Sequence, residues 1–201
     1  MKILGLCCSQ RKGGNTEFVL KEILQGAKQE GADVELYCIS GKDIKPCDGC
    51  HTCMKTGICH VKDDVQEIFT KMLESQGIIF GVPSYYYGMP GDAKNIIDRT
   101  TSLNVPGRKL ANKVGSVVTV GGSLGLASIL KDIYLYMISK QMLPANFWAG
   151  YGLQKAEVAN YENGKKAARD LGRQMVKIAA KGFEYPSDIP GSVFGYGTWN
   201  K

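Results

Sequence analysis

The chain has 201 residues, of which 44% are apolar and 22% charged, and its formal net charge is +6 at pH 7. This length suits one domain with a full hydrophobic core. Because no run of 18 apolar residues occurs, we expect neither a membrane span nor a membrane partner. Seven cysteines, and an apolar start too short for a secretory signal, indicate a reducing compartment, so we expect a cytoplasmic protein.

The N-terminal segment predicts a phosphate-binding loop between a strand and a helix. Residues 2–8 form an apolar run, and helical spacing of apolar residues follows up to about Gly31. Unpaired N–H groups and the helix dipole favour an anion where such a loop enters a helix, although the same side chains could simply cap it. The loop has neither Walker A nor dinucleotide-fingerprint spacing. The candidate ligands are Ser9, Gln10, Arg11, Gly14, Asn15 and Thr16.

After a predicted strand over residues 33–39 comes a cysteine-rich loop over residues 44–62, in which Cys47, Cys50, Cys53 and Cys59 have the spacing C-x2-C-x2-C-x5-C. Thiolates this close repel one another unless a metal centre gathers them. The spacing is close to the bacterial ferredoxin run, and its wider last gap favours a single [4Fe–4S] cluster held by all four. Zinc, with His51 and His60 nearby, and metal-free thiols or a disulfide remain the alternatives.

A helix is predicted after Asp63 and Asp64, and then a continuous apolar run over residues 77–82, typical of a strand buried in a parallel sheet. The loop that follows contains prolines, glycines and three tyrosines. Ligands bind at the carboxyl ends of such strands, so this loop is a candidate to hold a planar heteroaromatic ring. A tyrosine cluster that caps the core is the alternative. The candidates are Pro83, Ser84, Tyr85, Tyr86, Tyr87 and Gly88.

The second half of the chain continues the alternation of helices and strands. A helix is predicted over residues 92–103, then a buried strand over residues 113–120. The glycine-rich loop after this strand suits close contact of backbone amides with a ligand ring. Its candidate residues are Gly121, Gly122 and Gly125.

The next helix, over residues 126–142, is apolar nearly all round, which predicts either a homo-oligomer or a deeply buried helix. A strand over residues 143–149 and a helix over residues 161–181 follow. We interpret the basic stripe on this helix as solvent-exposed, and because no aromatic residues interleave it we expect no nucleic-acid partner. Residues 185–201 predict an irregular C-terminal arm beyond a domain of residues 1–184. The stripe is Lys165, Arg169, Arg173, Lys177 and Lys181.

Five strands alternating with helices predict an α/β fold, a flavodoxin-like doubly wound parallel sheet of strand order 2-1-3-4-5 with the cysteine loop inserted. In this order the ends of the first, third and fourth strands are neighbours. Their phosphate, tyrosine and glycine loops therefore converge, and the combination suits FMN.

At these residues the chain resembles the NADPH-dependent FMN reductase-like flavoproteins, and more closely their iron–sulfur flavoprotein branch from anaerobes. Residues 9–16 are similar to the family's phosphate loop S-x-R-x-x-(G/S)-N-T, and residues 83–86 to its P-x-Y flavin loop. The cysteine motif and the Gly121-Gly122 pair also match, over about residues 1–150 in all. Cys8 stands where the family usually has Gly, which we expect to narrow the phosphate pocket.

The resemblance implies an FMN-dependent oxidoreductase whose chemistry is centred on the flavin, with no catalytic protein side chain. It implies electron entry from a ferredoxin-like donor at a [4Fe–4S] cluster, or from NAD(P)H at the flavin, exit to a small-molecule acceptor, and a homodimer or homotetramer. The alternative is a cluster-free NAD(P)H-dependent FMN or quinone reductase. A zinc-stabilised, non-enzymatic binding protein is a more remote alternative. No dedicated dinucleotide site is visible, so NADH and NADPH are not distinguished.

Overall fold

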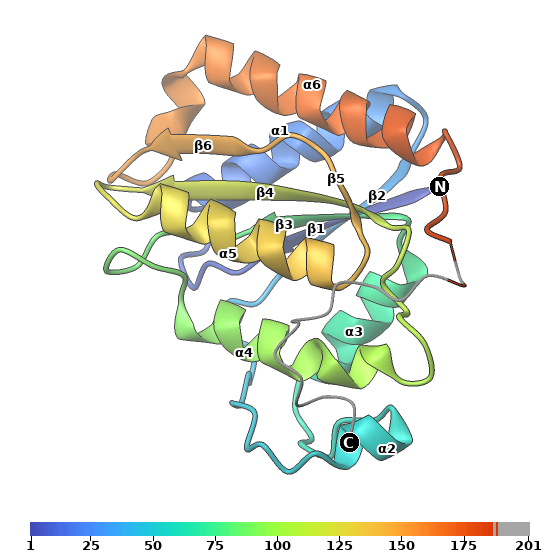
Figure 1. The fold of residues 1–201 in the computed structure, drawn as a ribbon. Helices are drawn as coiled ribbons and strands as arrows, with labels where there is room; N and C mark the ends of the chain where they lie inside the picture. Colours follow the sequence, from blue (N-terminus) through green and yellow to red (C-terminus); the bar gives the residue numbers. More distant parts are fainter. Residues whose placement is uncertain (187, 189–201) are drawn as a thin grey trace.

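The computed structural model describes residues 1–186 and 188, and its centre is a parallel sheet with helices on both faces (Figure 1). The strand order is β2-β1-β3-β4-β5, as predicted, with β6 also paired to β4. Every strand pair recorded among these residues is parallel, because the chain between two paired strands crosses over through at least one helix. The strands are β1 (Lys2–Cys7), β2 (Asp33–Cys38), β3 (Gly77–Gly81), β4 (Val114–Gly121), β5 (Leu143–Pro144) and β6 (Trp148–Tyr151).

The fifth predicted strand is wrong in its extent. In place of one strand over residues 143–149 there are two short strands, β5 and β6, and β6 continues to Tyr151. Both pair with β4, through Leu143 opposite Val114 and Trp148 opposite Val118. Pro144 has no N–H group to continue a ladder. The backbone then leaves the sheet at Asn146, whose N–H group donates to the Gln174 side chain and whose carbonyl accepts from the Ser116 hydroxyl in β4.

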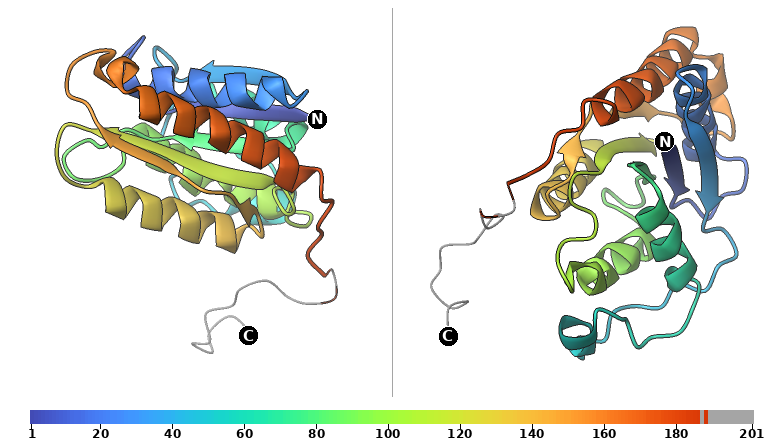
Figure 2. Two further views of the ribbon diagram at one scale, coloured as in Figure 1. Left: turned by 90° about the horizontal axis from the view of Figure 1, so that it is seen from above. Right: turned by 90° about the vertical axis from the view of Figure 1, so that its right-hand side faces the viewer.

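The helices divide between the two faces of the sheet (Figures 1 and 2). Side chains alternate along the central strands, so that Leu4 and Leu6 join one apolar cluster and Ile3 and Cys7 the other. The helices are α1 (Asn15–Gln29), α2 (Thr52–Thr56), α3 (Val65–Glu74), α4 (Gly91–Arg99), α5 (Leu126–Ser139) and α6 (Glu162–Ala179), with short 3-10 helices η1 (Thr100–Asn104) and η2 (Glu157–Asn160). The first cluster packs under α3, α4 and α5, and the second under α1 and α6.

The predicted helices are confirmed, with two refinements. The helix expected over residues 92–103 is α4 continued by η1, and the cysteine loop contains the short helix α2, which the sequence pattern did not predict. The basic stripe on α6 is only partly solvent-exposed. Lys165 and Arg169 are half-buried, and Arg169 and Arg173 form ion pairs with Glu22 of α1 and with Glu30, which follows α1, each at 2.7 Å.

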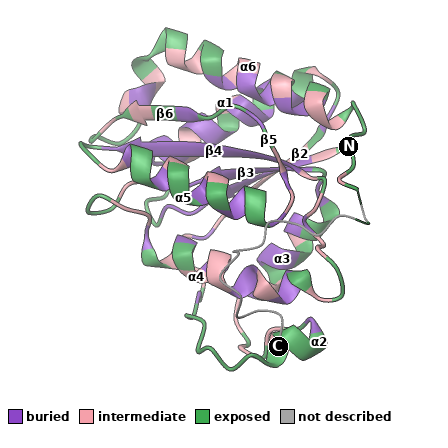
Figure 3. Cartoon of the chain, viewed as in Figure 1, coloured by how far each residue is buried: buried purple, intermediate pink, exposed green. Residues whose placement is uncertain are grey.

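The cysteine loop extends beyond α3 and α4, where α2 packs against η1 on the side of those helices that faces away from the sheet (Figures 1 and 2). Most of this loop is exposed, in contrast to the buried strands (Figure 3). Within residues 1–186 and 188, the structure contains no helix with the length and apolar character needed to cross a membrane. Apart from residues 185, 186 and 188, the predicted arm lies outside the described residues.

Candidate functional site

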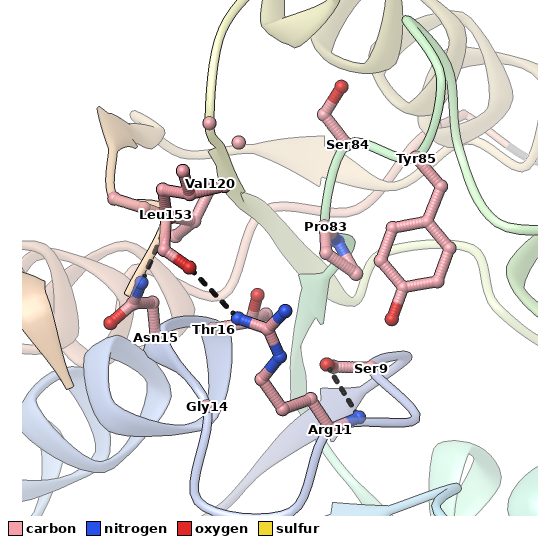
Figure 4. Close-up of a pocket in the computed structure, with 13 residues that line it drawn as sticks. Ser9, Arg11, Gly14, Asn15, Thr16, Pro83, Ser84, Tyr85, Val120 and Leu153 are labelled. Carbon is pink, nitrogen blue, oxygen red and sulfur yellow. Dashed lines mark hydrogen bonds between the residues drawn. The ribbon is translucent and has the colours of Figure 1, made fainter. Parts of the chain in front are cut away.

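The loops after β1, β3 and β4 converge on one cavity of about 160 Å³, as the strand order predicted (Figure 4). The loop after β6 closes a further side. Ten of the fifteen residues proposed for the cofactor line this cavity, and Gln10, Tyr86, Tyr87, Gly88 and Gly125 do not. The lining is Ser9, Arg11, Gly14, Asn15, Thr16, Pro83, Ser84, Tyr85, Val120, Gly121, Gly122, Gly152 and Leu153.

The polar end of the cavity is the start of α1. Gly14 stands at the N-cap in extended conformation, and no side chain caps the helix. Among the described residues, no acceptor is recorded for the backbone N–H groups of Asn15 and Thr16. The acidic Glu17 in this turn is directed elsewhere, because its carboxylate accepts from the Gly13 N–H at 2.7 Å and from Lys21. Open amides at the positive end of a helix are a fitting site for a phosphate group.

Two of the predicted phosphate ligands instead hold the loop after β6. The Asn15 amide group donates to the carbonyls of Gly152 at 3.0 Å and Gln154 at 2.8 Å. The Arg11 guanidinium lines the cavity while donating to the Leu153 carbonyl at 3.0 Å (Figure 4). Asn15 therefore fixes the wall of the site, and Arg11 brings a positive charge to its mouth.

The predictions for Gln10 and Cys8 need correction. The Gln10 side chain lies outside the cavity, because its amide group donates to Asp92 in the first turn of α4 at 2.7 Å and so links the loop after β1 to that helix. Cys8 does not narrow the phosphate pocket, because its side chain is buried in the core cluster under α3 and α4. The Ser9 side chain, in contrast, does line the cavity, and its oxygen accepts from the Arg11 backbone N–H at 3.2 Å.

The tyrosine loop divides between the cavity and an adjoining open hollow. Tyr85 lines the cavity beside Pro83 and Ser84, and bonds through its backbone to Gly88 across a tight turn. Tyr86 and Tyr87 have positive φ angles of 45° and 69° and are exposed, so the alternative of a core-capping tyrosine cluster is wrong. Both line the hollow, of about 420 Å³, with Ser84, Gly122, Ser123, Leu124 and Leu153.

The glycines at the end of β4 let two other loops approach closely. A Cβ atom on Gly121 would lie 2.8 Å from the Ser84 Cβ, and one on Gly122 would lie 2.9 Å from the Leu153 side chain. A flat group entering between these loops would meet backbone and not side chain. Gly125 has a φ of +96° and packs against the Tyr87 backbone instead of lining the cavity, so it shapes the tyrosine loop.

Sequence reasoning missed Gly152, Leu153 and Val120 as lining residues. The rule that ligands bind after strand ends would have found Gly152 and Leu153, had the last strand been predicted to end at Tyr151 and not at residue 149.

A second cavity, of about 390 Å³, lies between the cysteine loop and the end of α4. All four cysteines of the motif line it, and all four are free thiols, so the disulfide alternative is wrong for the described residues. The pKa of Cys53 is raised, first by burial and then by the charges of the neighbouring cysteines Cys59, Cys47 and Cys50. Four thiols around one space form the donor set of an iron–sulfur cluster, so these residues fit that group.

The two histidines of the loop have protein partners. His51 Nδ1 lies 3.3 Å from the Met54 sulfur, and His60 Nε2 lies 2.8 Å from an Asp48 carboxylate oxygen. Ligand atoms of Asp48, Cys50 and His60 lie within 4.8 Å of one another. These three exposed side chains could hold a zinc ion, which keeps the zinc alternative open, but they include only one of the four cysteines.

Comparison with known proteins identifies the family of the chain. Residues 1–151 match the family described as NADPH-dependent FMN reductase. An iron–sulfur flavoprotein of Methanocaldococcus jannaschii is 34% identical over 188 residues, covering 89% of this chain and 97% of that protein. An iron–sulfur flavoprotein of Methanosarcina thermophila is 37% identical over 123 residues, covering 61% and 64%.

Solved structures share the fold. A flavone reductase superposes with a TM-score of 0.69 at 23% identity, over 90% of this chain and 63% of its own length. An NAD(P)H:quinone oxidoreductase from Methanothermobacter marburgensis has a TM-score of 0.66 at 14% identity, over 87% and 98%. An archaeal flavodoxin, with a TM-score of 0.59 at 16% identity over 90% and 99%, has the same flavodoxin-like arrangement.

Proposed function

We propose that this chain, which belongs to the iron–sulfur flavoprotein branch of the NADPH-dependent FMN reductase family, passes electrons to a small acceptor through FMN and a [4Fe–4S] cluster. As a member it is a flavin-dependent oxidoreductase that binds FMN. The observation that supports the cluster is the arrangement of Cys47, Cys50, Cys53 and Cys59 around one cavity.

The FMN phosphate would bind at the start of α1, where the amides of Asn15 and Thr16 are open and Arg11 supplies charge. Gly121 and Gly122 would present backbone to the ring, and Tyr85 its aromatic side chain. The flavin, when bound, supplies both one-electron and two-electron chemistry. Protein residues here bind and orient the cofactor, and no side chain is assigned as a proton donor.

The proposed electron source is a ferredoxin-like protein, or NAD(P)H, in the cytoplasm. The cysteine loop supports the first, because it stands out from the fold with Cys47 and Cys50 exposed to an approaching protein. The hollow beside Tyr86 and Tyr87 supports entry of a small molecule, since it is open to solvent next to the flavin cavity.

A cluster-free NAD(P)H-dependent FMN or quinone reductase is the second candidate, and this same hollow favours it. Its aromatic and aliphatic lining, from Tyr86, Tyr87 and Leu124, suits a planar acceptor. The remote alternative, a zinc-stabilised protein without turnover, has only the exposed triplet of Asp48, Cys50 and His60 in its favour.

We also propose a homodimer or homotetramer. The inner side of α5 is buried, but Leu135 and Ile138 on its outer side are exposed, as is Phe147 before β6. Exposed apolar side chains on neighbouring elements support contact with a second copy of the chain.

The test of the cluster is an assay of iron, acid-labile sulfide, zinc and flavin on one anaerobically reconstituted sample. We expect about four irons per chain together with FMN. The double variant Cys50→Ser, Cys53→Ser is the matched control and should retain FMN while losing iron. Flavin without iron or sulfide in the wild type would contradict the cluster and leave the second candidate.

A further inference from the structure

The side chain of Arg99, the last residue of α4, is completely buried beneath the cysteine loop. Arginine is seldom fully buried unless its charge and its donors are satisfied. Arg99 also lines the cysteine cavity. Its contacts should therefore satisfy its charge and its donors.

Three of its contacts fasten the loop on both sides of the cysteine motif. The guanidinium donates to the Lys45 carbonyl at 3.1 Å and to the Val61 carbonyl at 2.9 Å. It also forms an ion pair with the Asp63 carboxylate, which is equally buried. These bonds account for the terminal nitrogens and neutralise the charge.

The fourth contact is different in kind. Arg99 Nε lies 3.4 Å from the sulfur of Cys59 and donates its N–H group to it. A neutral thiol is a weak acceptor, whereas a negatively charged sulfur accepts strongly from a cationic donor. A fastening role alone does not require Nε to be aimed at a cysteine, since the carbonyls and the carboxylate already hold the loop.

We propose that Arg99 is a positioning residue for Cys59, and that its N–H···S bond raises the reduction potential of the cluster. The inference rests on the proposed [4Fe–4S] site. Reduction adds negative charge that spreads onto the cysteine sulfurs, so a donor and positive charge beside one of them favour the reduced state. Hydrogen bonds to sulfur are among the determinants of cluster potentials.

A second buried cation provides a matched control. Lys140, just after α5, donates to the Thr100 carbonyl at 3.2 Å and to the Asn104 side chain at 3.0 Å. Asn104 and Arg99 line the same cavity. Lys140 thus brings charge to this region, but it has no recorded hydrogen bond to a cysteine sulfur in the described part of the chain.

The experiment is an EPR-monitored redox titration of the reconstituted protein and of Arg99→Lys, Arg99→Gln and Lys140→Gln. We expect a more negative cluster potential in both Arg99 variants. Glutamine removes both the positive charge and the Nε–H donor, whereas lysine keeps the charge but lacks the Nε–H group and the planar guanidinium. The shift in Lys140→Gln should be smaller, and the FMN potential should stay constant throughout. An unchanged cluster potential in Arg99→Gln, or an equal shift in Lys140→Gln, would overturn the inference.

Should the Arg99 variants fail to fold or to hold iron, the wild type still provides a test. Pulsed EPR of the reduced cluster in protein labelled with 15N-arginine should detect coupling to an arginine nitrogen, since only Arg99 among the arginines has a recorded bond to a cysteine sulfur in residues 1–186 and 188. A cluster with a normal EPR signal but without this coupling would overturn the role of Arg99 and leave the proposed function standing. A wild-type protein that binds flavin but no iron would overturn both the proposed cluster and the role of Arg99.

Discussion

Individual side chains give the two cavities different chemistry. The flavin cavity offers backbone amides at the start of α1 and the guanidinium of Arg11, which are hard donors for an anion. The cysteine cavity offers four thiols, which are soft ligands for a transition metal. Each assignment can be tested with one substitution or one reagent.

Arg11→Gln should weaken FMN binding by roughly tenfold to a hundredfold, the range for a hydrogen bond to a charged group. Riboflavin, which lacks the phosphate, should bind this variant about as well as it binds the wild type. Quenching of flavin fluorescence during titration measures both affinities. Lys12→Gln is the control, because Lys12 is exposed and does not line the cavity. Equal losses for FMN and riboflavin would show that Arg11 does not face the phosphate.

The cysteines should separate into reactive and protected groups in the reduced, metal-free protein. Cys47 and Cys50 are exposed, whereas Cys7 and Cys8 are buried. Burial raises the pKa of Cys8 to about 12, and the hydrogen bond with Cys38 raises that of Cys7. Alkylation at pH 8, followed by peptide mass spectrometry, should modify Cys8 far more slowly than Cys47, because Cys8 is buried and Cys47 exposed. Comparable rates in the folded protein would contradict the structure.

At the scale of elements, the buried pair of Asp63 and Arg99 joins the cysteine loop to α4. Removing one partner of a buried ion pair leaves the other uncompensated, so Asp63→Asn should lower the free energy of unfolding by about 3–5 kcal/mol at pH 7. Asp64→Asn, at the neighbouring and more exposed carboxylate, should change it by less than about 1 kcal/mol. Urea denaturation of the metal-free protein measures both.

The ion pair of Asp63 and Arg99 also predicts that the free energy of unfolding depends on pH. Burial opposes ionisation of Asp63, but the Arg99 guanidinium and two backbone N–H groups outweigh it and hold its pKa below the ordinary 3.8. The stabilisation is therefore complete above pH 3.8 and is lost as the pH falls through the lower folded value. Unfolding curves should show the difference between wild type and Asp63→Asn shrinking in that acidic range. A difference independent of pH would contradict the ion pair.

The contact between α1 and α6 depends on glycine. A Cβ atom on Gly172 would lie 1.9 Å from the Ile23 carbonyl oxygen, and one on Gly26 would lie 2.0 Å from that of Arg169. Gly172→Ala should therefore destabilise the fold by about 1–3 kcal/mol or more, because the helices must move apart. Gly91→Ala, where no atom lies within 4 Å, should stay within about 0.5 kcal/mol. Equal urea midpoints would show that the two helices are not this close.

At the scale of the whole molecule, the strand order and the convergence of three loops could be predicted from the sequence. Buried parallel strands read as apolar runs such as residues 77–82, and crossover rules leave few ways to order them. The contacts of Arg99 could not be predicted, because Cys59 and Asp63 lie far from it in the chain and a charged residue in a helical pattern normally faces solvent. The separate C-terminal arm stays a prediction, since most of it lies outside the described residues.

In the function that we propose, electrons from a protein donor reach FMN through the cysteine site. The most direct test follows flavin bleaching by anaerobic stopped-flow, with a reduced low-potential ferredoxin or NADPH as donor. FMN-loaded Cys50→Ser, Cys53→Ser protein should lose reduction by ferredoxin relative to the reconstituted wild type, while reduction by NADPH persists in both. Equal rates of flavin reduction by ferredoxin with and without the cluster would contradict electron transfer through the cysteine site.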